Sequence, residues 1–277
     1  MFPSGLAMAT GALGLRLVLV AGVAKAVPPA PAAAALARLS YVERKVEQGP
    51  PGSWREAREG GALQVGDQLR TAQDALLRVD FSWMAMTVSA SSVIRFPEGP
   101  FLQTILDQGR VALLAERREM LKLLTDEAEV RGRGSVIVRR RDKDTLVSSL
   151  AGRFYVEGTG RALDVPAGSG TIVRAGQPPT AAVALPAPPE ELAPGGDPVF
   201  VAPGELLHLR WKGRAASYHV ELLAVGSETV LLERDVTVPE LELAIRWPGA
   251  FRWRVASRDA GGLEGLPSGF GLICVDQ

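Results

Sequence analysis

The residues that could perform acid–base or metal chemistry are few in this chain. Its 277 residues include only two histidines, His208 and His219. Each histidine alternates with apolar neighbours along a predicted strand, so we expect both side chains to point to solvent. Consecutive strands of this kind often lie in opposite sheets, which would separate the two imidazoles. The sequence therefore predicts no catalytic residue, neither a Ser-His-Asp triad nor another set, and no metal pair.

The acidic residues and the glycine clusters favour structural roles as well. Asp67 follows Gly66, and Asp259 lies in another glycine-containing turn, where a carboxylate caps backbone donors. No closely spaced set of oxygen ligands suits Ca²⁺. The glycine clusters at 158–160 and 168–171 lack the lysine and the following helix of a phosphate loop. We therefore expect no bound cofactor and no enzyme activity.

The strongest local charge feature is a basic run that contains Arg139, Arg140 and Arg141. Nucleic-acid binding would favour interleaved aromatic residues and a basic total charge. The run has no aromatic residue, and 31 basic side chains balance 31 acidic ones over the whole chain. We interpret the run as a solvated edge strand or loop that charge protects from edge pairing. The alternative is an interaction patch for acidic envelope polymers; we expect no nucleic-acid partner.

The N-terminus has the layout of a secretory signal. Arg16 precedes a short apolar run, and Ala24-Lys25-Ala26 is an A-x-A site with cleavage after Ala26. We expect residues 1–26 to be a cleaved signal peptide; an uncleaved N-terminal anchor is the alternative. No cysteine follows the run, which excludes a lipoprotein, and the lone Cys274 excludes an internal disulfide. We therefore expect a periplasmic or otherwise exported protein, which meets the membrane only if the anchor stays.

Most of the chain is predicted to form short strands. Residues 27–36 are a Pro/Ala spacer, and from 37 to 175 alternating apolar runs are separated by glycine-containing turns. Glycine followed by a β-prone run recurs at Gly109, Gly134, Gly152 and Gly170, a loose repeat typical of a roll or solenoid. An ordinary meander or sandwich has the same periodicity. The segment 113–130 also permits a helix by composition.

The segment 54–71, WREAREGGALQVGDQLRT, combines a tryptophan, two turns and an apolar alternation. It resembles the opening of the FecR family domain, and the matching residues include Trp54, Gly60, Leu63, Gly66, Asp67, Leu69 and Thr71. The resemblance continues weakly through 109–135 and implies strands there, which we favour over the helix. It implies an extracytoplasmic, non-enzymatic β domain over 37–175.

A second β unit follows a proline-rich linker. Residues 176–196 form the linker, because seven prolines between Gly176 and Pro198 remove backbone donors. Residues 197–277 contain six or seven short alternating runs. Trp211 and Trp253 lie within such runs and are predicted core residues. The unit resembles a fibronectin type III or Ig-like β-sandwich through runs such as Pro248–Val255, where Phe251 replaces the usual tyrosine.

These observations predict an all-β protein, a FecR-type roll or solenoid-like domain followed by an Ig/fibronectin III-like sandwich. The resemblance implies a non-enzymatic periplasmic binding or scaffold protein, with an envelope protein or cell-wall polymer as partner. Only about 26 residues precede the spacer, so we expect no cytoplasmic sigma-binding segment of the kind the family can carry. One alternative is an extracytoplasmic signal-sensing component that works with a separate membrane or sigma-regulating partner. An envelope polysaccharide-acting enzyme is less favoured.

Overall fold

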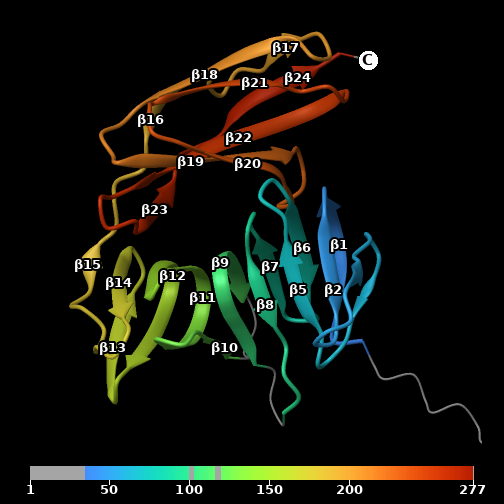
Figure 1. Cartoon of the computed structure of the whole chain (residues 1–277). Coiled ribbons are helices and arrows are strands. Elements are labelled where there is room, and N and C mark those ends of the chain that lie inside the picture. The colour runs from blue at the N-terminus through green and yellow to red at the C-terminus, as the bar shows by residue number, and fades with distance from the viewer. Residues whose placement is uncertain (1–34, 100–102, 116–119, 277) are drawn as a thin grey trace, which may run out of the picture. The chain divides into compact units, whose positions relative to one another are not determined.

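A computed structural model describes residues 35–99, 103–115 and 120–276. In these residues every regular element is a strand (Figure 1), which confirms the all-β prediction. The described residues belong to one compact unit. The predicted signal segment, its cleavage site at Ala26 and residues 27–34 of the spacer lie outside the described residues. Within the described residues, no helix has the length and apolar character needed to cross a membrane.

The first fifteen strands belong to one sheet. Its main path runs β15-β14-β12-β11-β10-β9-β7-β6-β1-β4, and β2, β3, β5, β8 and β13 branch from it. The strands are β1 (Ala37–Glu43), β2 (Val46–Gly49), β3 (Arg55–Glu56), β4 (Ala62–Leu63), β5 (Gln68–Thr71), β6 (Leu76–Asp80), β7 (Met84–Val88), β8 (Val93–Arg95), β9 (Thr104–Ala115), β10 (Leu121–Leu124), β11 (Glu129–Arg141), β12 (Asp144–Gly158), β13 (Arg161–Pro166), β14 (Ser169–Arg174) and β15 (Val183–Ala184).

The segment 113–130 forms strands where it is described, not a helix. It contains the end of β9, all of β10 and the start of β11. Leu121 and Leu123 are buried and alternate with the half-buried Lys122 and Leu124, which is the period of a strand. Because β10 pairs with both β9 and β11, this segment helps to join the middle of the sheet.

The recurring glycines lie inside long strands rather than before them. Gly109, Gly134 and Gly152 have φ angles of 97°, 117° and 86° within β9, β11 and β12. Gly134 and Gly152 are directly opposite across the β11–β12 pair, where the backbones approach closely. A side chain would clash there, since a Cβ on Gly152 would lie 2.0 Å from the Arg133 carbonyl oxygen. The repeat predicted from these glycines therefore marks bends in continuous strands.

The remaining nine strands form two sheets that share one core. A three-stranded sheet has the order β16-β18-β21, and a six-stranded sheet has the order β17-β24-β22-β19-β20, with β23 paired to β22. The strands are β16 (Glu190–Ala193), β17 (Val199–Val201), β18 (Leu206–Lys212), β19 (Ser217–Ala224), β20 (Val230–Val236), β21 (Glu240–Ala244), β22 (Gly249–Arg258), β23 (Glu264–Pro267) and β24 (Gly271–Val275). Two sheets around a common core make a β-sandwich.

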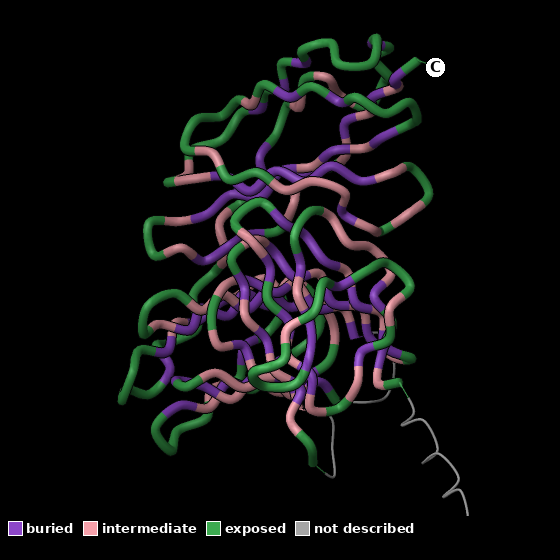
Figure 2. The backbone as a smooth tube through the Cα atoms, turned by 45° about the vertical axis from the view of Figure 1, so that its right-hand side comes forward, coloured by how far each residue is buried: buried purple, intermediate pink, exposed green. Residues whose placement is uncertain are grey.

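Each part has its own apolar core, and the buried residues follow the strands (Figure 2). In the sandwich, Trp211 from β18 packs against Tyr218 and Trp253 of the other sheet, with ring centroids 5.3 and 6.1 Å apart. These contacts join the two sheets, because a buried aromatic side chain contributes a large apolar surface.

The segment predicted as a linker carries short strands at both ends of its proline-rich stretch. β15 pairs with β14 of the first sheet, and β16 pairs with β18 of the sandwich. The carbonyl of Pro194 accepts a hydrogen bond from the Trp253 indole N–H at 3.1 Å. The chain therefore changes sheets between residues 184 and 190, while the exact domain boundaries stay a prediction.

Candidate functional site

The residues of the 54–71 motif build the core and turns of the first sheet. Leu63 and Leu69 are fully buried. The Thr71 hydroxyl donates a hydrogen bond to the Ser89 carbonyl at 2.7 Å, and an Asp67 carboxylate oxygen accepts one from the Gln64 N–H at 2.9 Å. These contacts give Leu63, Leu69, Thr71 and Asp67 a role in stabilising local structure.

The rest of the motif consists of turn and surface contacts. Gly60 and Gly66 have φ angles of 80° and 90°, which favour glycine. The Arg70 guanidinium carbon lies 4.3 Å from the centroid of the Trp54 ring. Of the tryptophans predicted as core, the structure buries both Trp211 and Trp253.

The prediction that His219 points to solvent is wrong. Its side chain is 3 % exposed, and Glu221 on the same strand face is also buried. β19 lies between β20 and β22, and the second face of this sheet contacts the first sheet through Arg110 of β9. Both faces of β19 are therefore covered. The alternation of polar and apolar residues had indicated that only one face was buried. His208 is half-exposed as expected and lies 3.4 Å from Glu242.

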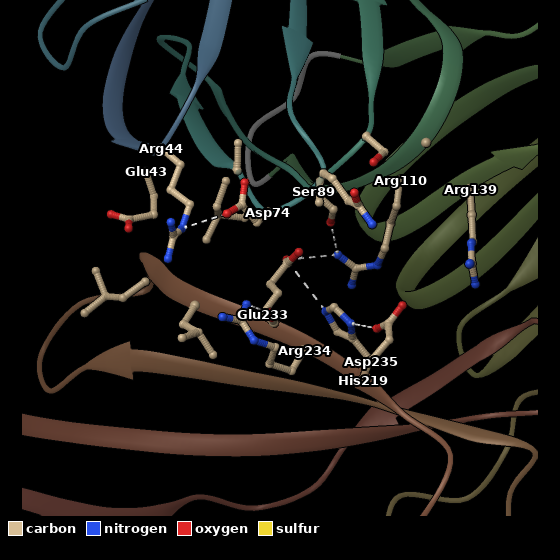
Figure 3. Close-up of a pocket in the computed structure, with 18 of the residues that line it drawn as sticks. Glu43, Arg44, Asp74, Ser89, Arg110, Arg139, His219, Glu233, Arg234 and Asp235 are labelled. Carbon is tan, nitrogen blue, oxygen red and sulfur yellow. Dashed lines mark hydrogen bonds and ion pairs between the residues drawn. The ribbon is translucent and has the colours of Figure 1, made fainter. Parts of the chain in front are cut away.

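An ionic cluster lies where the first sheet meets the sandwich (Figure 3). Arg110 is its centre: Nε and Nη2 donate to the two oxygens of Glu264 at 3.1 and 2.6 Å. Nη1 donates to the Ser89 hydroxyl at 2.9 Å and to Glu233 at 3.2 Å. The other members come from the sandwich: His219, Glu221, Asp235, Arg254 and Arg258.

The electrostatics of this cluster follow from its burial and its alternating charges. Burial and Arg110 alone would lower the pKa of His219, but Glu264 and the hydrogen bond to Asp235 outweigh them and raise it to about 10. Burial alone would raise the pKa of Glu221, yet His219 and Arg254 lower it to about 2. Arg110, His219 and Arg258 likewise hold the pKa of Glu264 well below its usual range against its burial. Glu221 and Glu264 are therefore ionised at neutral pH.

The interpretation as a solvated edge strand or loop is wrong for Arg139 and Arg140, because β11 has β9 and β12 as neighbours on its two sides there. Arg140 is largely buried and pairs with Glu127 at 2.8 Å and with Asp126 at 2.6 Å. Arg141 is exposed beside Asp142. Arg139 has no carboxylate partner among the described residues, and its burial together with Arg258 lowers its pKa.

A cleft of about 1440 Å³ opens beside the ionic cluster. Its walls come from the first sheet, including residues 107–110 and 139–142, and from residues 231–235, 242–244, 246 and 247 of the sandwich. Figure 3 shows Arg110 and Arg139 on one side and Glu233 to Asp235 on the other. Its charged lining is mixed. The arginines are Arg44, Arg110, Arg139, Arg140, Arg141, Arg234, Arg246 and Arg258, and the carboxylates are Glu43, Asp74, Asp107, Asp142, Glu233, Asp235 and Glu242.

Most of these charges neutralise one another, but arginine remains in excess. Arg139, Arg234 and Arg246 have no ion-pair partner in the described part of the chain. Among the lining carboxylates that are described, Glu43 and Glu242 have no arginine or lysine partner, and Glu242 lies beside His208. Glu43 lies 3.3 Å from the Tyr41 hydroxyl. The cleft can therefore accept an anionic group at a position where the protein supplies no carboxylate.

Sequence reasoning marked Arg139 and Arg141 but missed the other side of the cleft. The sandwich residues Arg234, Arg246 and Trp247 are far from the basic run in sequence, and only folding brings them to it. A usable signal was the alternation His219-x-Glu221 and Glu233-x-Asp235, which places four ionisable groups on one face of neighbouring strands.

Comparison with known proteins does not identify a family. No family model matches the chain, and no curated protein matches it. Two solved structures of a candidate anti-sigma factor from Parabacteroides distasonis ATCC 8503 resemble part of it, with 17 % sequence identity and a TM-score of 0.38. The matched region covers 42 % of this chain and 59 % of that protein. The FecR assignment therefore remains a resemblance.

Proposed function

We propose that this chain is a non-enzymatic binding protein of the cell envelope that holds an acidic glycan in the cleft between its first sheet and its sandwich. The observation that carries the proposal is Arg139. It lines the cleft, is partly desolvated, and has no carboxylate partner among the described residues. A guanidinium in this setting gains more binding free energy from the carboxylate or phosphate of a ligand than does a guanidinium that is already paired within the protein.

The exposed indole ring of Trp247 favours a sugar over a simple anion as the ligand of the cleft. Trp247 lines the same cleft and is 43 % exposed, and its ring meets Phe251 edge-on with centroids 6.4 Å apart. This contact orients the indole while a large part of it stays accessible. A flat apolar face near unpaired arginines suits a uronic acid residue, which offers an apolar ring face and a carboxylate.

The N-terminal signal-like segment supports an envelope location, where acidic glycans occur. Resemblance to the FecR domain points the same way. A cell-wall polymer is therefore the partner we propose, and an envelope protein is the alternative.

A signal-sensing role is the second candidate, and one observation favours it. The cleft is lined by both sheet systems, and the contact beside it consists of ion pairs such as Arg110–Glu264 and Arg110–Glu233. An anion bound there would touch both walls and compete with these pairs. Binding could thus change the contact that a separate membrane or sigma-regulating partner reads.

The test is a calorimetric titration with oligogalacturonate. We expect Arg139→Gln to weaken binding about tenfold, the value of one charged hydrogen bond. Arg153→Gln is the matched control, since Arg153 is an exposed strand arginine that does not line the cleft. Equal affinity of wild type and Arg139→Gln, or equal affinity for neutral cello-oligosaccharides, would refute the proposal.

A further inference from the structure

Four ionisable side chains lie on one face of two neighbouring strands. In the β19–β20 pair, His219 is opposite Asp235, and Glu221 is opposite Glu233. Two carboxylates directly opposite each other on antiparallel strands repel and destabilise the pair unless a cation lies between them. Arg110 supplies part of this positive charge, with Nη2 3.9 Å from Glu221 and Nη1 3.2 Å from Glu233, and His219 lies beside the same two carboxylates.

His219 is oriented toward this site as a metal-binding histidine would be. Its Nδ1 lies 2.7 Å from an Asp235 carboxylate oxygen. Its Nε2 is buried, has no hydrogen-bond partner among the described residues, and lies 3.6 Å from one oxygen of Glu221 and 3.6 Å from one of Glu233. A carboxylate that holds one ring nitrogen and leaves the other facing further ligands is the usual arrangement behind a metal-bound imidazole.

The spacing of the donor atoms suits a small divalent ion. The three atoms, His219 Nε2 and one oxygen each from Glu221 and Glu233, all lie within 4.8 Å of one another. Zinc binds nitrogen and oxygen at about 2.0–2.2 Å, so tetrahedral donors are about 3.3–3.6 Å apart. The two measured nitrogen–oxygen separations therefore need almost no adjustment.

Carboxylates and guanidinium groups are nearly matched around these ligands. Four carboxylates (Glu221, Glu233, Asp235 and Glu264) face three guanidinium groups (Arg110, Arg254 and Arg258). A proton and a metal ion exclude each other at Nε2 of His219, so metal binding displaces any proton held there.

We propose that His219, Glu221 and Glu233 bind a divalent transition metal, zinc by preference, with Asp235 orienting the imidazole and water as the fourth ligand. Imidazole with carboxylate ligands suits zinc, and three protein ligands leave one position open. The ion would replace the Arg110 contacts to Glu221 and Glu233, while Arg110 keeps its paired contact to Glu264.

Two cavities give access to the site. The large cleft is lined by His219 and Glu233, and a smaller cavity of about 170 Å³ is lined by His219 and Glu221. A hydrated ion can therefore reach the ligands from the cleft side. This proposal does not depend on the glycan proposed above.

The experiment is a zinc titration of the full chain by calorimetry, in a Cys274→Ser background that removes the one thiol. The two histidines provide a matched pair: His219→Gln removes a proposed ligand, and His208→Gln removes a half-exposed imidazole outside the site. We expect one zinc per chain, unchanged in His208→Gln and weakened at least about tenfold in His219→Gln. Circular dichroism checks that each variant is folded.

A spectrum provides a second readout that does not depend on a folded variant. Cobalt bound to the wild-type Cys274→Ser chain should show the intense visible bands of a tetrahedral nitrogen–oxygen site, and one equivalent of zinc should abolish them. Absence of one-site zinc binding, equal affinity in His219→Gln, loss in His208→Gln, or a cobalt spectrum without tetrahedral bands would each overturn the proposal and leave His219 as a proton-bearing cation.

Discussion

At the scale of single residues, adjacent arginines on β11 have opposite roles. Arg140 is buried against Glu127, which is itself nearly inaccessible. Arg139 faces the cleft without a carboxylate partner among the described residues. The strand alternation that separates these side chains determines which arginine stabilises the fold and which is available to a ligand.

Replacing Glu127 by Gln should cost the protein about 3 kcal/mol, because Arg140 would keep its buried charge without its main partner. Arg140 lowers the pKa of Glu127, so the stabilisation is present above the unfolded-state value of about 4.3 and is lost as pH falls through the folded-state value. Urea unfolding of both proteins between pH 7 and pH 3 measures this. The wild type should lose more stability on acidification than the variant; parallel curves would contradict the assignment.

Trp211→Ala should destabilise the chain by about 3–5 kcal/mol, since this side chain is 4 % exposed and joins the two sheets of the sandwich. Its indole N–H is buried with no hydrogen-bond partner among the described residues, so Trp211→Phe should cost clearly less. Thermal melting compares them. Trp247→Ala is the control, with an expected change below about 1 kcal/mol; equal effects at the two tryptophans would count against this core.

The alternation of polar and apolar residues predicted part of the sandwich core from the sequence. It placed Trp211 and Trp253 in the core, whereas the preference for strands over a helix near Leu121 came from the resemblance to the FecR domain. The alternation failed at His219 and Glu221, whose face of the strand is covered by charged groups while the other face packs in an apolar core. Such a strand has the same polar–apolar alternation as one with a solvent-exposed face. Nothing in the local sequence shows that Arg110, 109 positions before His219, supplies the compensating charge.

At the scale of elements, glycine determines how the long strands bend. The close approach of β11 and β12 at Gly134 and Gly152 leaves no space for a Cβ. Sequence reasoning recognised the repeat but interpreted these glycines as turns. A bend inside a strand and a turn between strands can both require a positive φ, so glycine occurs in both.

Gly152→Ala should therefore destabilise the first sheet by more than about 3 kcal/mol, combining a positive φ with a clash against the Arg133 carbonyl. Gly160→Ala is the matched control, because Gly160 has a φ of 71° with no neighbour within 4 Å of the added carbon. It should cost only about 1–2 kcal/mol. Chemical unfolding of both variants measures the difference, and equal losses would show that the steric contact is unimportant.

At the scale of the whole molecule, a buried arginine joins the two sheet systems. Arg110 comes from β9 and meets Glu264 and Glu233 of the sandwich, and the Tyr41 hydroxyl adds a hydrogen bond to the Leu231 carbonyl at 3.0 Å. The contact also contains a small apolar cluster in which Leu76 packs with Leu223 and Val230, so it combines polar and apolar interactions.

Arg110→Gln should lower the unfolding free energy by about 3–5 kcal/mol, because Glu264 and its neighbours would lose their central cation. We also expect calorimetry to resolve two transitions in the variant where the wild type shows one. Arg95→Gln is the control, since the Arg95–Asp107 pair lies partly in solvent within the first sheet, and its loss should cost about 1 kcal/mol or less. A single unshifted transition in Arg110→Gln would contradict this role.

The central claim is that an acidic glycan is held by both walls of the cleft at once, and amide hydrogen exchange with and without oligogalacturonate tests it most directly. We predict simultaneous protection of residues 107–110 and 139–142 on one wall and of residues 231–235 on the other. Protection confined to one wall, or none at a saturating ligand concentration, would contradict the claim.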